Sequence, residues 1–270
     1  MKLVLYSNGV FVGRPGKAFA GVNGRVGGVR GSVLGFSLAS RRRLRRWLLS
    51  KCVAGCTMYG VTLTVPRPDD MSNVCDKFRN VFHRFRVSWV RCFPRCGFVW
   101  RVELQRSRVP HLHLISYHDS PVSSSDYLGL WFSSLSTDFL IPSLSAFARR
   151  GVLVELLDGS INSYRYICDH GSKAKQDQLG WIGRQWGIIG KGLFSDRLGS
   201  TFDIPDFLEI PFNRFLSKVC RFRVKSDCVF GSRLSRGRKK FSVAYLNENA
   251  VRRWLVFNGL KINSFHIPSH

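Results

Sequence analysis

Hydrophobic and polar residues alternate in several short runs along the middle of the chain. Because neighbouring side chains of a strand point to opposite faces, this alternation predicts β-strands over residues 58–66, 98–105, 109–117 and 152–157. Between the first two runs, apolar residues recur three or four apart, which predicts an amphipathic helix over residues 73–91. Shorter helical patterns cover residues 120–137, 160–176 and 244–257, and a glycine-rich strand or loop covers residues 183–190.

The order of these elements is typical of an α/β (α+β) fold. The short polar link at residues 106–108 predicts that the two central strands form an antiparallel hairpin. We therefore expect a central antiparallel sheet with helices packed on one face, which leaves the other face open. Residues 1–39 are rich in glycine and predict a poorly ordered arm with at most a weak hairpin, and the chain beyond Pro205 is basic and less patterned.

The charge of the chain is strongly unbalanced. It has 42 Lys and Arg residues against 17 Asp and Glu, a formal net charge of +25. Such an imbalance favours a polyanionic partner and points to nucleic acid. An acidic membrane is the competing partner, but the apolar runs are shorter than the roughly 18 residues that a spanning helix needs. The first residues are also too mixed in polarity for a secretory signal, so we expect a cytoplasmic protein outside the membrane.

Two further patterns concern basic residues and cysteines. Residues 41–51 place Leu44, Trp47 and Leu48 at helical spacing among basic residues, which predicts a helix that lies on phosphates or is simply solvated. Eight cysteines are too few for a disulfide scaffold in a chain of 270 residues, and reduced thiols are expected. The spaced pairs Cys52 with Cys56 and Cys92 with Cys96 leave a structural zinc site as an alternative.

The most specific pattern lies in the predicted hairpin. Glu103 is on its first strand, and His111 and His113 are on its second. Residues two apart on a strand share a face, so both imidazoles lie on one side of the sheet. Imidazole nitrogens with one carboxylate oxygen suit a divalent metal ion and leave positions open for a substrate. The sequence therefore predicts a three-residue metal site.

A second group lies on the helix expected over residues 160–176. Tyr166, His170 and Lys173 fall at spacings of four and three, so they line one helical face. A tyrosine with a nearby cation is a credible nucleophile, because the cation stabilises developing phenolate and phosphate charge. Together with the metal site, this pattern predicts phosphoryl transfer on a polyanion.

These motifs, in this order, resemble those of the HUH endonuclease superfamily. The quoted residues are LTV after Gly60, PHLHL with the upstream Glu103, and the stretch YICDHGSKAKQDQLGWIGRQWGIIGK from Tyr166 to Lys191. This last stretch looks like the tyrosine-motif region of the rolling-circle replication initiators, or Rep proteins, of filamentous and single-stranded DNA phages and related small plasmids. The resemblance covers residues 57–191 and implies the RRM-like HUH nuclease fold.

The resemblance implies specific roles. Glu103, His111 and His113 would bind Mg²⁺ or Mn²⁺, Tyr166 would become linked to a DNA 5′ phosphate, and Lys173 would assist it. Many relatives have a lysine nearer the tyrosine, where this chain has His170, so His170 is an alternative partner. Tyr164 is the alternative nucleophile, although on a helix it faces nearly opposite to Tyr166. Residues expected to contact DNA are Arg41, Arg42, Arg43, Arg45, Arg46, Lys175 and Arg184.

The expected organisation and function follow from this resemblance. Residues 1–56 would form a basic arm and helix, residues 57–191 the endonuclease domain, and residues 192–270 a basic extension. The protein would nick and rejoin single-stranded DNA at a replication origin and start rolling-circle replication with the host helicase and polymerase. One alternative is a non-catalytic single-strand-binding module that uses Phe98 and Trp100 to stack bases. The other is a transposase or relaxase of the same superfamily.

Overall fold

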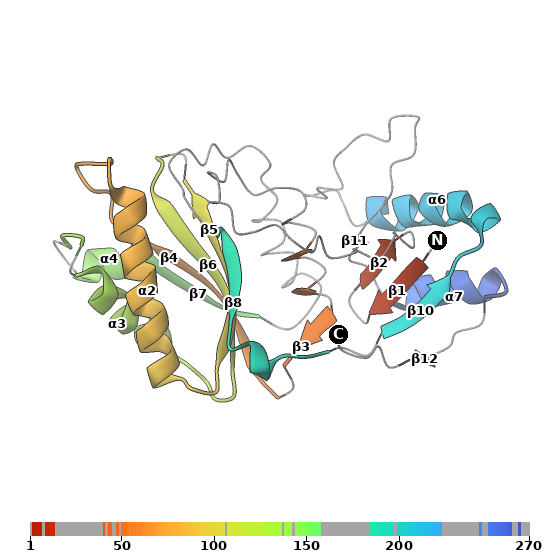
Figure 1. Cartoon of the computed structure of the whole chain (residues 1–270), viewed down its shortest axis with the longest axis horizontal. Coiled ribbons are helices and arrows are strands. Elements are labelled where there is room, and N and C mark those ends of the chain that lie inside the picture. The colour runs from red at the N-terminus through yellow and green to blue at the C-terminus, as the bar shows by residue number, and fades with distance from the viewer. Residues whose placement is uncertain are drawn as a thin grey trace, which may run out of the picture.

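The larger of two lobes contains the central sheet (Figure 1). The computed structural model describes residues 2–6, 9–13, 40, 43–44, 47–48, 50–53, 55–105, 107–136, 138–141, 144–157, 184–196, 199–222, 243–244, 248–260 and 264–265. Five strands pair antiparallel in the order β7-β4-β6-β5-β8. They are β4 (Thr57–Thr64), β5 (Gly97–Leu104), β6 (Pro110–His118), β7 (Val152–Leu157) and β8 (Trp186–Ile189).

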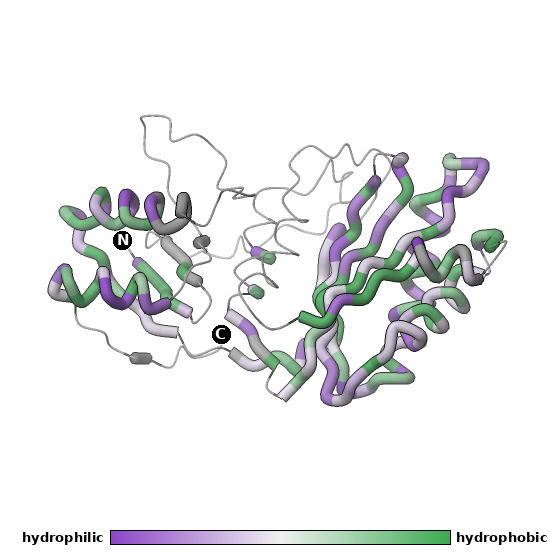
Figure 2. The backbone as a smooth tube through the Cα atoms, turned by 180° about the vertical axis from the view of Figure 1, so that it is seen from behind, coloured by the Kyte–Doolittle hydropathy of each residue, from purple (hydrophilic) through white to green (hydrophobic). Residues whose placement is uncertain are grey.

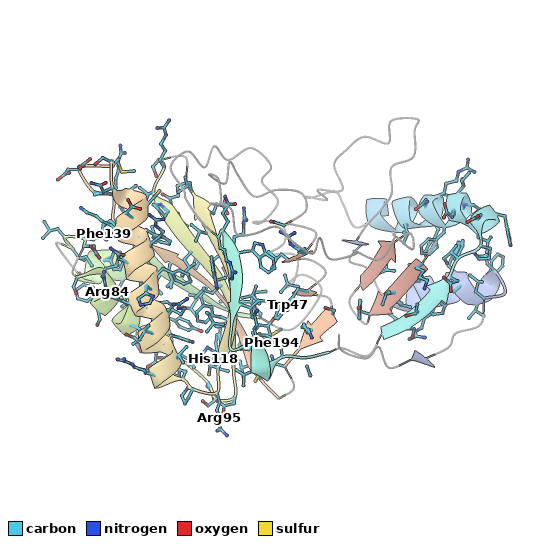
Figure 3. The ribbon with its side chains drawn as sticks, viewed as in Figure 1. Trp47, Arg84, Arg95, His118, Phe139 and Phe194 are labelled. Carbon is cyan, nitrogen blue, oxygen red and sulfur yellow. The ribbon has the colours of Figure 1, made fainter. Side chains whose placement is uncertain are left out.

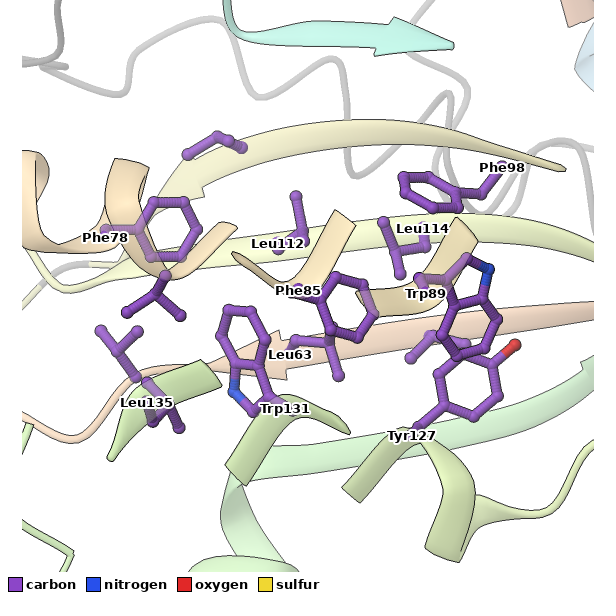
Figure 4. Close-up of a cluster of buried hydrophobic side chains, with 14 of the residues drawn as sticks. Leu63, Phe78, Phe85, Trp89, Phe98, Leu112, Leu114, Tyr127, Trp131 and Leu135 are labelled. Atoms are coloured by element: carbon purple, nitrogen blue, oxygen red, sulfur yellow. The ribbon is translucent and has the colours of Figure 1, made fainter. Parts of the chain in front are cut away.

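Helices cover one face of this sheet, as the sequence predicts. They are α2 (Val74–Cys92), α3 (Ser124–Leu135) and α4 (Leu144–Gly151). The apolar stripe of α2 buries Phe78, Phe85 and Trp89 completely. Figure 4 shows these rings between the helix and the sheet, with Trp131 and Tyr127 of α3 beside them. The mixed α+β fold with a central antiparallel sheet is confirmed.

The opposite face of the sheet is not fully open. The described residues 40, 43, 44, 47, 48 and 50 are helical, so the predicted basic helix forms there. Its Leu44 and Leu48 are each 1% exposed and pack on Val99, Ile115 and Tyr117 of β5 and β6. Directly after the helix, β3 (Lys51–Cys52) pairs with β9 (Ser195–Asp196). The apolar stripe of this helix is therefore a sheet contact and not a solvated surface.

A second lobe joins the two ends of the chain, where the sequence predicted an arm and an extension. Its sheet has the order β11-β2-β1-β10-β12. The strands are β1 (Lys2–Tyr6), β2 (Gly9–Gly13), β10 (Gly199–Asp203), β11 (Val243–Ala244) and β12 (Ser264–Phe265). Leu3 pairs with Phe202 across about 200 residues of sequence. The expected arm therefore contains paired strands, and residues 1–56 do not form a unit separate from residues 192–270.

Two helices cover this smaller sheet. They are α6 (Asp206–Phe222) and α7 (Glu248–Phe257), and Phe212 and Leu255 from them are fully buried against Leu3 and Leu5. Figure 2 shows hydrophobic and hydrophilic residues alternating along both helices. Helix α7 was predicted, but α6 was not, because Pro211 interrupts the pattern. A proline inside a helix removes one backbone hydrogen bond, and here burial of Leu208, Phe212 and Leu216 outweighs that loss.

The helix predicted over residues 160–176 lies outside the described residues. Strand β8 falls within the predicted residues 183–190, and a short 3-10 helix, η1 (Lys191–Leu193), follows it. None of the described helices is long and apolar enough to cross a membrane.

A polar network is buried beneath α3 at the end of the large sheet. Nδ1 of His118 lies 3.0 Å from Sγ of Cys96, and its Nε2 lies 2.9 Å from the hydroxyl of Tyr127, which also bonds Ser116. Figure 3 marks His118 at this end of the sheet. His118 is fully buried, and burial lowers its pKa to about 4. The network therefore requires a neutral imidazole.

This network predicts a stability loss in mild acid. The unfolded chain binds a proton on His118 below its ordinary pKa of 6.5, whereas the folded chain does so only near 4. The free energy of unfolding should therefore fall as the pH drops from 6.5 to 4, by roughly 2 to 3 kcal/mol from this residue. The free energy of unfolding, measured by urea denaturation at several pH values, should fall less steeply with decreasing pH in His118→Gln than in wild type. His83→Gln, on the exposed side of α2, is the control, and equal slopes in all three proteins would contradict the assignment.

Candidate functional site

The strand register brings the three predicted metal ligands onto one face. Glu103 of β5 pairs directly with His111 of β6, and His113 is one pair further along the same face. That face is opposite to α2 and α3, because the alternate residues Leu112 and Leu114 point into the helix-covered core. The predicted juxtaposition of Glu103 and the two histidines is therefore present.

Two threonines of β4 hold the histidine rings. Thr62 pairs with His113 and Thr64 pairs with His111 in the register. Oγ1 of Thr62 is 3.2 Å from Nδ1 of His113, and Oγ1 of Thr64 is 3.0 Å from Nδ1 of His111. The rings are nearly parallel, with an interplanar angle of 12° and centroids 6.2 Å apart. Both imidazoles are thus oriented through Nδ1, in the way that a hydrogen bond to one ring nitrogen orients a histidine whose other nitrogen binds a metal.

An arginine that the sequence analysis did not single out completes the cluster. Oε2 of Glu103 lies 3.4 Å from Nε2 of His113 and 3.6 Å from Nη1 of Arg101. Arg101 is 1% exposed, Glu103 5% and His113 7%. One carboxylate oxygen therefore lies between a guanidinium and an imidazole in a region largely closed to water, where charges interact more strongly than at the surface.

The donor set fits a divalent metal in its chemistry. The two imidazoles have Nδ1 turned to threonines, which leaves Nε2 as the natural ligand atom, and Glu103 supplies an oxygen already close to one of them. Within the part of the chain that the structure describes, no three His, Cys, Asp or Glu side chains are gathered into a metal-binding group. Glu103 lies close to the ring of His113 and is the direct strand partner of His111.

The basic helix packs beside this cluster on the same face. Figure 3 shows Trp47 of the helix against Phe194, which follows η1, and their ring centroids are 4.7 Å apart. Phe194 also packs edge-on against Tyr117 at a centroid distance of 5.0 Å. Ile115 and Val99 belong to the helix contact, and His113 and Arg101 are the next residues along the same face of β6 and β5.

The other predicted site residues are only partly described. Arg43 is exposed on the basic helix and its Nη2 donates to Oγ of Ser40 at 2.9 Å. Arg184 is exposed at the start of the edge segment that leads into β8. Outside the described residues lie Tyr164, Tyr166, His170, Lys173, Lys175, Arg41, Arg42, Arg45 and Arg46.

The cysteines give no sign of the alternative zinc site among the described residues. Cys56, Cys92 and Cys96 are free thiols, with Cys92 exposed and Cys96 buried. Cys96 contacts His118, and burial raises the pKa of its thiol to about 11. Burial therefore favours the uncharged thiol of Cys96 at neutral pH.

Three residues of the cluster were missed as site residues, although the sequence carries their signal. Arg101 stands two before Glu103, and Thr62 and Thr64 are two apart on their strand. The same period of two that groups His111 with His113 groups each of these pairs on one face. The face itself was predictable, but pairing Thr62 with His113 required the register of β4 against β6.

Comparison with known proteins adds little to this geometry. No family model and no curated protein sequence matches the chain. It is similar to the crystal structure of the hypothetical protein ORF119 from Sulfolobus islandicus rod-shaped virus 1, with 14% sequence identity, over 52% of this chain and 97% of that chain. The TM-score is 0.26, so this likeness carries no argument. The function must be inferred from the residues themselves.

The buried charges predict an asymmetric stability response. Glu103→Gln removes the carboxylate that faces Arg101 and should lower the free energy of unfolding by about 3 kcal/mol, because a buried guanidinium loses its counter-charge. Adding Arg101→Met should recover most of this loss. Urea denaturation of the two single variants and the double variant measures the coupling. Glu155→Gln, exposed on β7, is the matched control. If the loss of unfolding free energy in the double variant equals the sum of the losses in the two single variants, the charge pairing is contradicted.

Proposed function

We propose that the chain is a metal-dependent endonuclease and strand transferase that nicks and rejoins single-stranded DNA to start rolling-circle replication. The observation that carries this proposal is the arrangement of Glu103, His111 and His113 on one face of an antiparallel sheet whose other face is covered by helices. The threonine contacts to both Nδ1 atoms support a metal-binding role for the imidazoles.

Each residue of the cluster has a task in this proposal. Glu103, His111 and His113 hold Mg²⁺ or Mn²⁺, which when bound would polarise the scissile phosphate. Thr62 and Thr64 fix the ring orientations through Nδ1, which leaves the Nε2 atom of each imidazole as its ligand atom. Burial of Glu103 and His113 limits competing water and strengthens their attraction for a cation.

The covalent step is assigned to Tyr166, on the resemblance of its surrounding sequence. Its phenolic oxygen attacks the scissile phosphorus, a bond from that oxygen to phosphorus forms, and the bond to the 3′ oxygen breaks. The phenol proton passes to His170 or to water, Lys173 as a cation stabilises the developing charge on the phenolate and the phosphate, and the departing 3′ oxygen gains a proton from water. DNA is left with a free 3′ hydroxyl, and its 5′ phosphate is joined to the tyrosine, so the reverse reaction restores the strand.

The charge of the chain supports a nucleic-acid partner. A net charge of +25 releases counterions from DNA on binding, and the basic helix beside the cluster carries the exposed Arg43. Arg184 is exposed on the approach to β8. The proposed partners are single-stranded origin DNA and a host helicase and polymerase, and the proposed location is the host cytoplasm.

A non-catalytic binding module is less well supported. That alternative needs Phe98 and Trp100 to stack on bases, but Phe98 is completely buried under α2. Trp100 packs edge-on against Phe82 of α2, with ring centroids 4.9 Å apart. Both rings belong to the helix-covered face and are not a stacking platform. The transposase or relaxase alternative shares the proposed chemistry and differs in its DNA partner.

The central test is covalent capture of DNA. The protein should form an adduct with circular single-stranded DNA of its replicon in the presence of Mn²⁺, detected as a nuclease-resistant mass on the tyrosine. Tyr166→Phe removes only the hydroxyl and should abolish the adduct, and Tyr164→Phe is the matched control that should keep it. An adduct that persists in Tyr166→Phe and disappears in Tyr164→Phe would reassign the nucleophile. The absence of any adduct with wild type would reject the function.

The threonine contacts generate a separate prediction. Thr62→Val preserves shape but removes the hydroxyl that orients His113, so metal affinity should fall by about tenfold or more. Mn²⁺ titration and the rate of adduct formation both measure this loss. Thr201→Val, in the smaller lobe, should change neither. If Thr62→Val binds Mn²⁺ as tightly as wild type, the threonine has no role in arranging the metal site.

A further inference from the structure

Arg101 is buried in the candidate site and has no task in the chemistry described above. It pairs with His113 across the two strands and is 1% exposed. Its Nη1 lies 3.6 Å from Oε2 of Glu103, the same oxygen that lies 3.4 Å from Nε2 of His113. Glu103, as an expected metal ligand, thus already has a cation beside it.

The charge balance of the site follows from this arrangement. A guanidinium stays protonated in proteins, so Arg101 places a permanent positive charge beside the carboxylate of Glu103. A divalent ion bound at Glu103 would bring two more positive charges close to this guanidinium, in a region where Arg101, Glu103 and His113 are all nearly inaccessible to water. Excess buried charge is unfavourable unless an opposite charge compensates it.

We propose that Arg101 makes metal binding at Glu103 depend on a phosphodiester. Without an anion, the guanidinium holds Glu103 and keeps the metal affinity low. When a phosphodiester enters, its negative charge offsets the positive charge of the metal and the guanidinium. The guanidinium is drawn to the phosphate, because its forked donors suit phosphate oxygens. Glu103 is then released to the metal. The inference rests on the proposed function, because it takes Glu103 as a ligand and DNA as the source of the phosphate.

This role makes the metal and the phosphate thermodynamically coupled. Each ligand raises the affinity of the site for the other by the same factor, since coupling between binding sites is reciprocal. The protein would hold little metal when no DNA is present. Arg101 is in this sense a positioning residue, because it acts on the metal through Glu103 and on the substrate through charge.

The test measures Mn²⁺ binding directly, by the electron paramagnetic resonance signal of free Mn²⁺, in the full-length chain. Arg101→Met should bind Mn²⁺ at least tenfold more tightly than wild type without DNA. Saturating oligothymidine, a phosphodiester without an origin sequence, should tighten binding at least fivefold in wild type and less than twofold in Arg101→Met. Arg91→Met removes the same charge on the exposed side of α2 and should behave as wild type.

Further variants separate charge from packing. Arg101→Lys keeps the positive charge and should keep the weak, phosphate-dependent binding, which a purely structural role does not require. Glu103→Gln added to Arg101→Met should remove the tight binding. If Arg101→Met does not fold, Arg101→Gln serves in its place, with the shift of the melting temperature by Mn²⁺ as a second readout.

The proposal is overturned if Arg101→Met and Arg101→Gln bind Mn²⁺ no more tightly than wild type. It is also overturned if no protein binds Mn²⁺ with or without oligothymidine. Failure of the nicking function has a different outcome: Arg101→Met still binds Mn²⁺ more tightly than wild type, and no DNA adduct forms at any Mn²⁺ concentration.

Discussion

The antiparallel register of β4, β6 and β5 is the constraint on which the rest of the structure depends. It sends Leu112 and Leu114 into the core under α2 and the intervening His113 to the opposite face. A slip of one residue would exchange these faces, burying imidazoles among aromatic rings and exposing leucines. The large apolar area under α2 therefore fixes the register. The same register aligns His111 and His113 with their threonines and with Glu103.

Burial gives the cluster its chemical character. Glu103 and Arg101 are held out of water, so removing either charge has consequences that a surface ion pair does not have. A divalent cation bound at Glu103 would lie close to the Arg101 guanidinium, and the repulsion between the two positive charges opposes its binding. The polar network on the helix-covered face carries no charge, because His118 is neutral and hydrogen-bonded within the core. One sheet thus separates a charged face from an uncharged polar network.

Sequence periodicity predicted those parts of the fold whose information is local. The long helix α2 and the strands β5 and β6 follow from side-chain spacing within a few residues, and so does the shared face of Glu103 and the histidines. The pairing of β1 with β10 does not, because Leu3 meets Phe202 through contacts that no local pattern encodes. Pro211 concealed α6, whose stability comes from burial against that distant sheet. The contact between Glu103 and His113 likewise depended on the register of β5 against β6.

The segment from β8 to β10 links these parts mechanically. Trp186–Ile189 forms the edge strand beside β5, and Trp186 pairs with Arg101 itself. A few residues later, Phe194 packs between Trp47 of the basic helix and Tyr117 of β6, and Gly199–Asp203 enters the smaller sheet beside β1. The same short stretch of sequence therefore supplies the strand partner of Arg101, the aromatic contact of the basic helix and a strand of the smaller sheet.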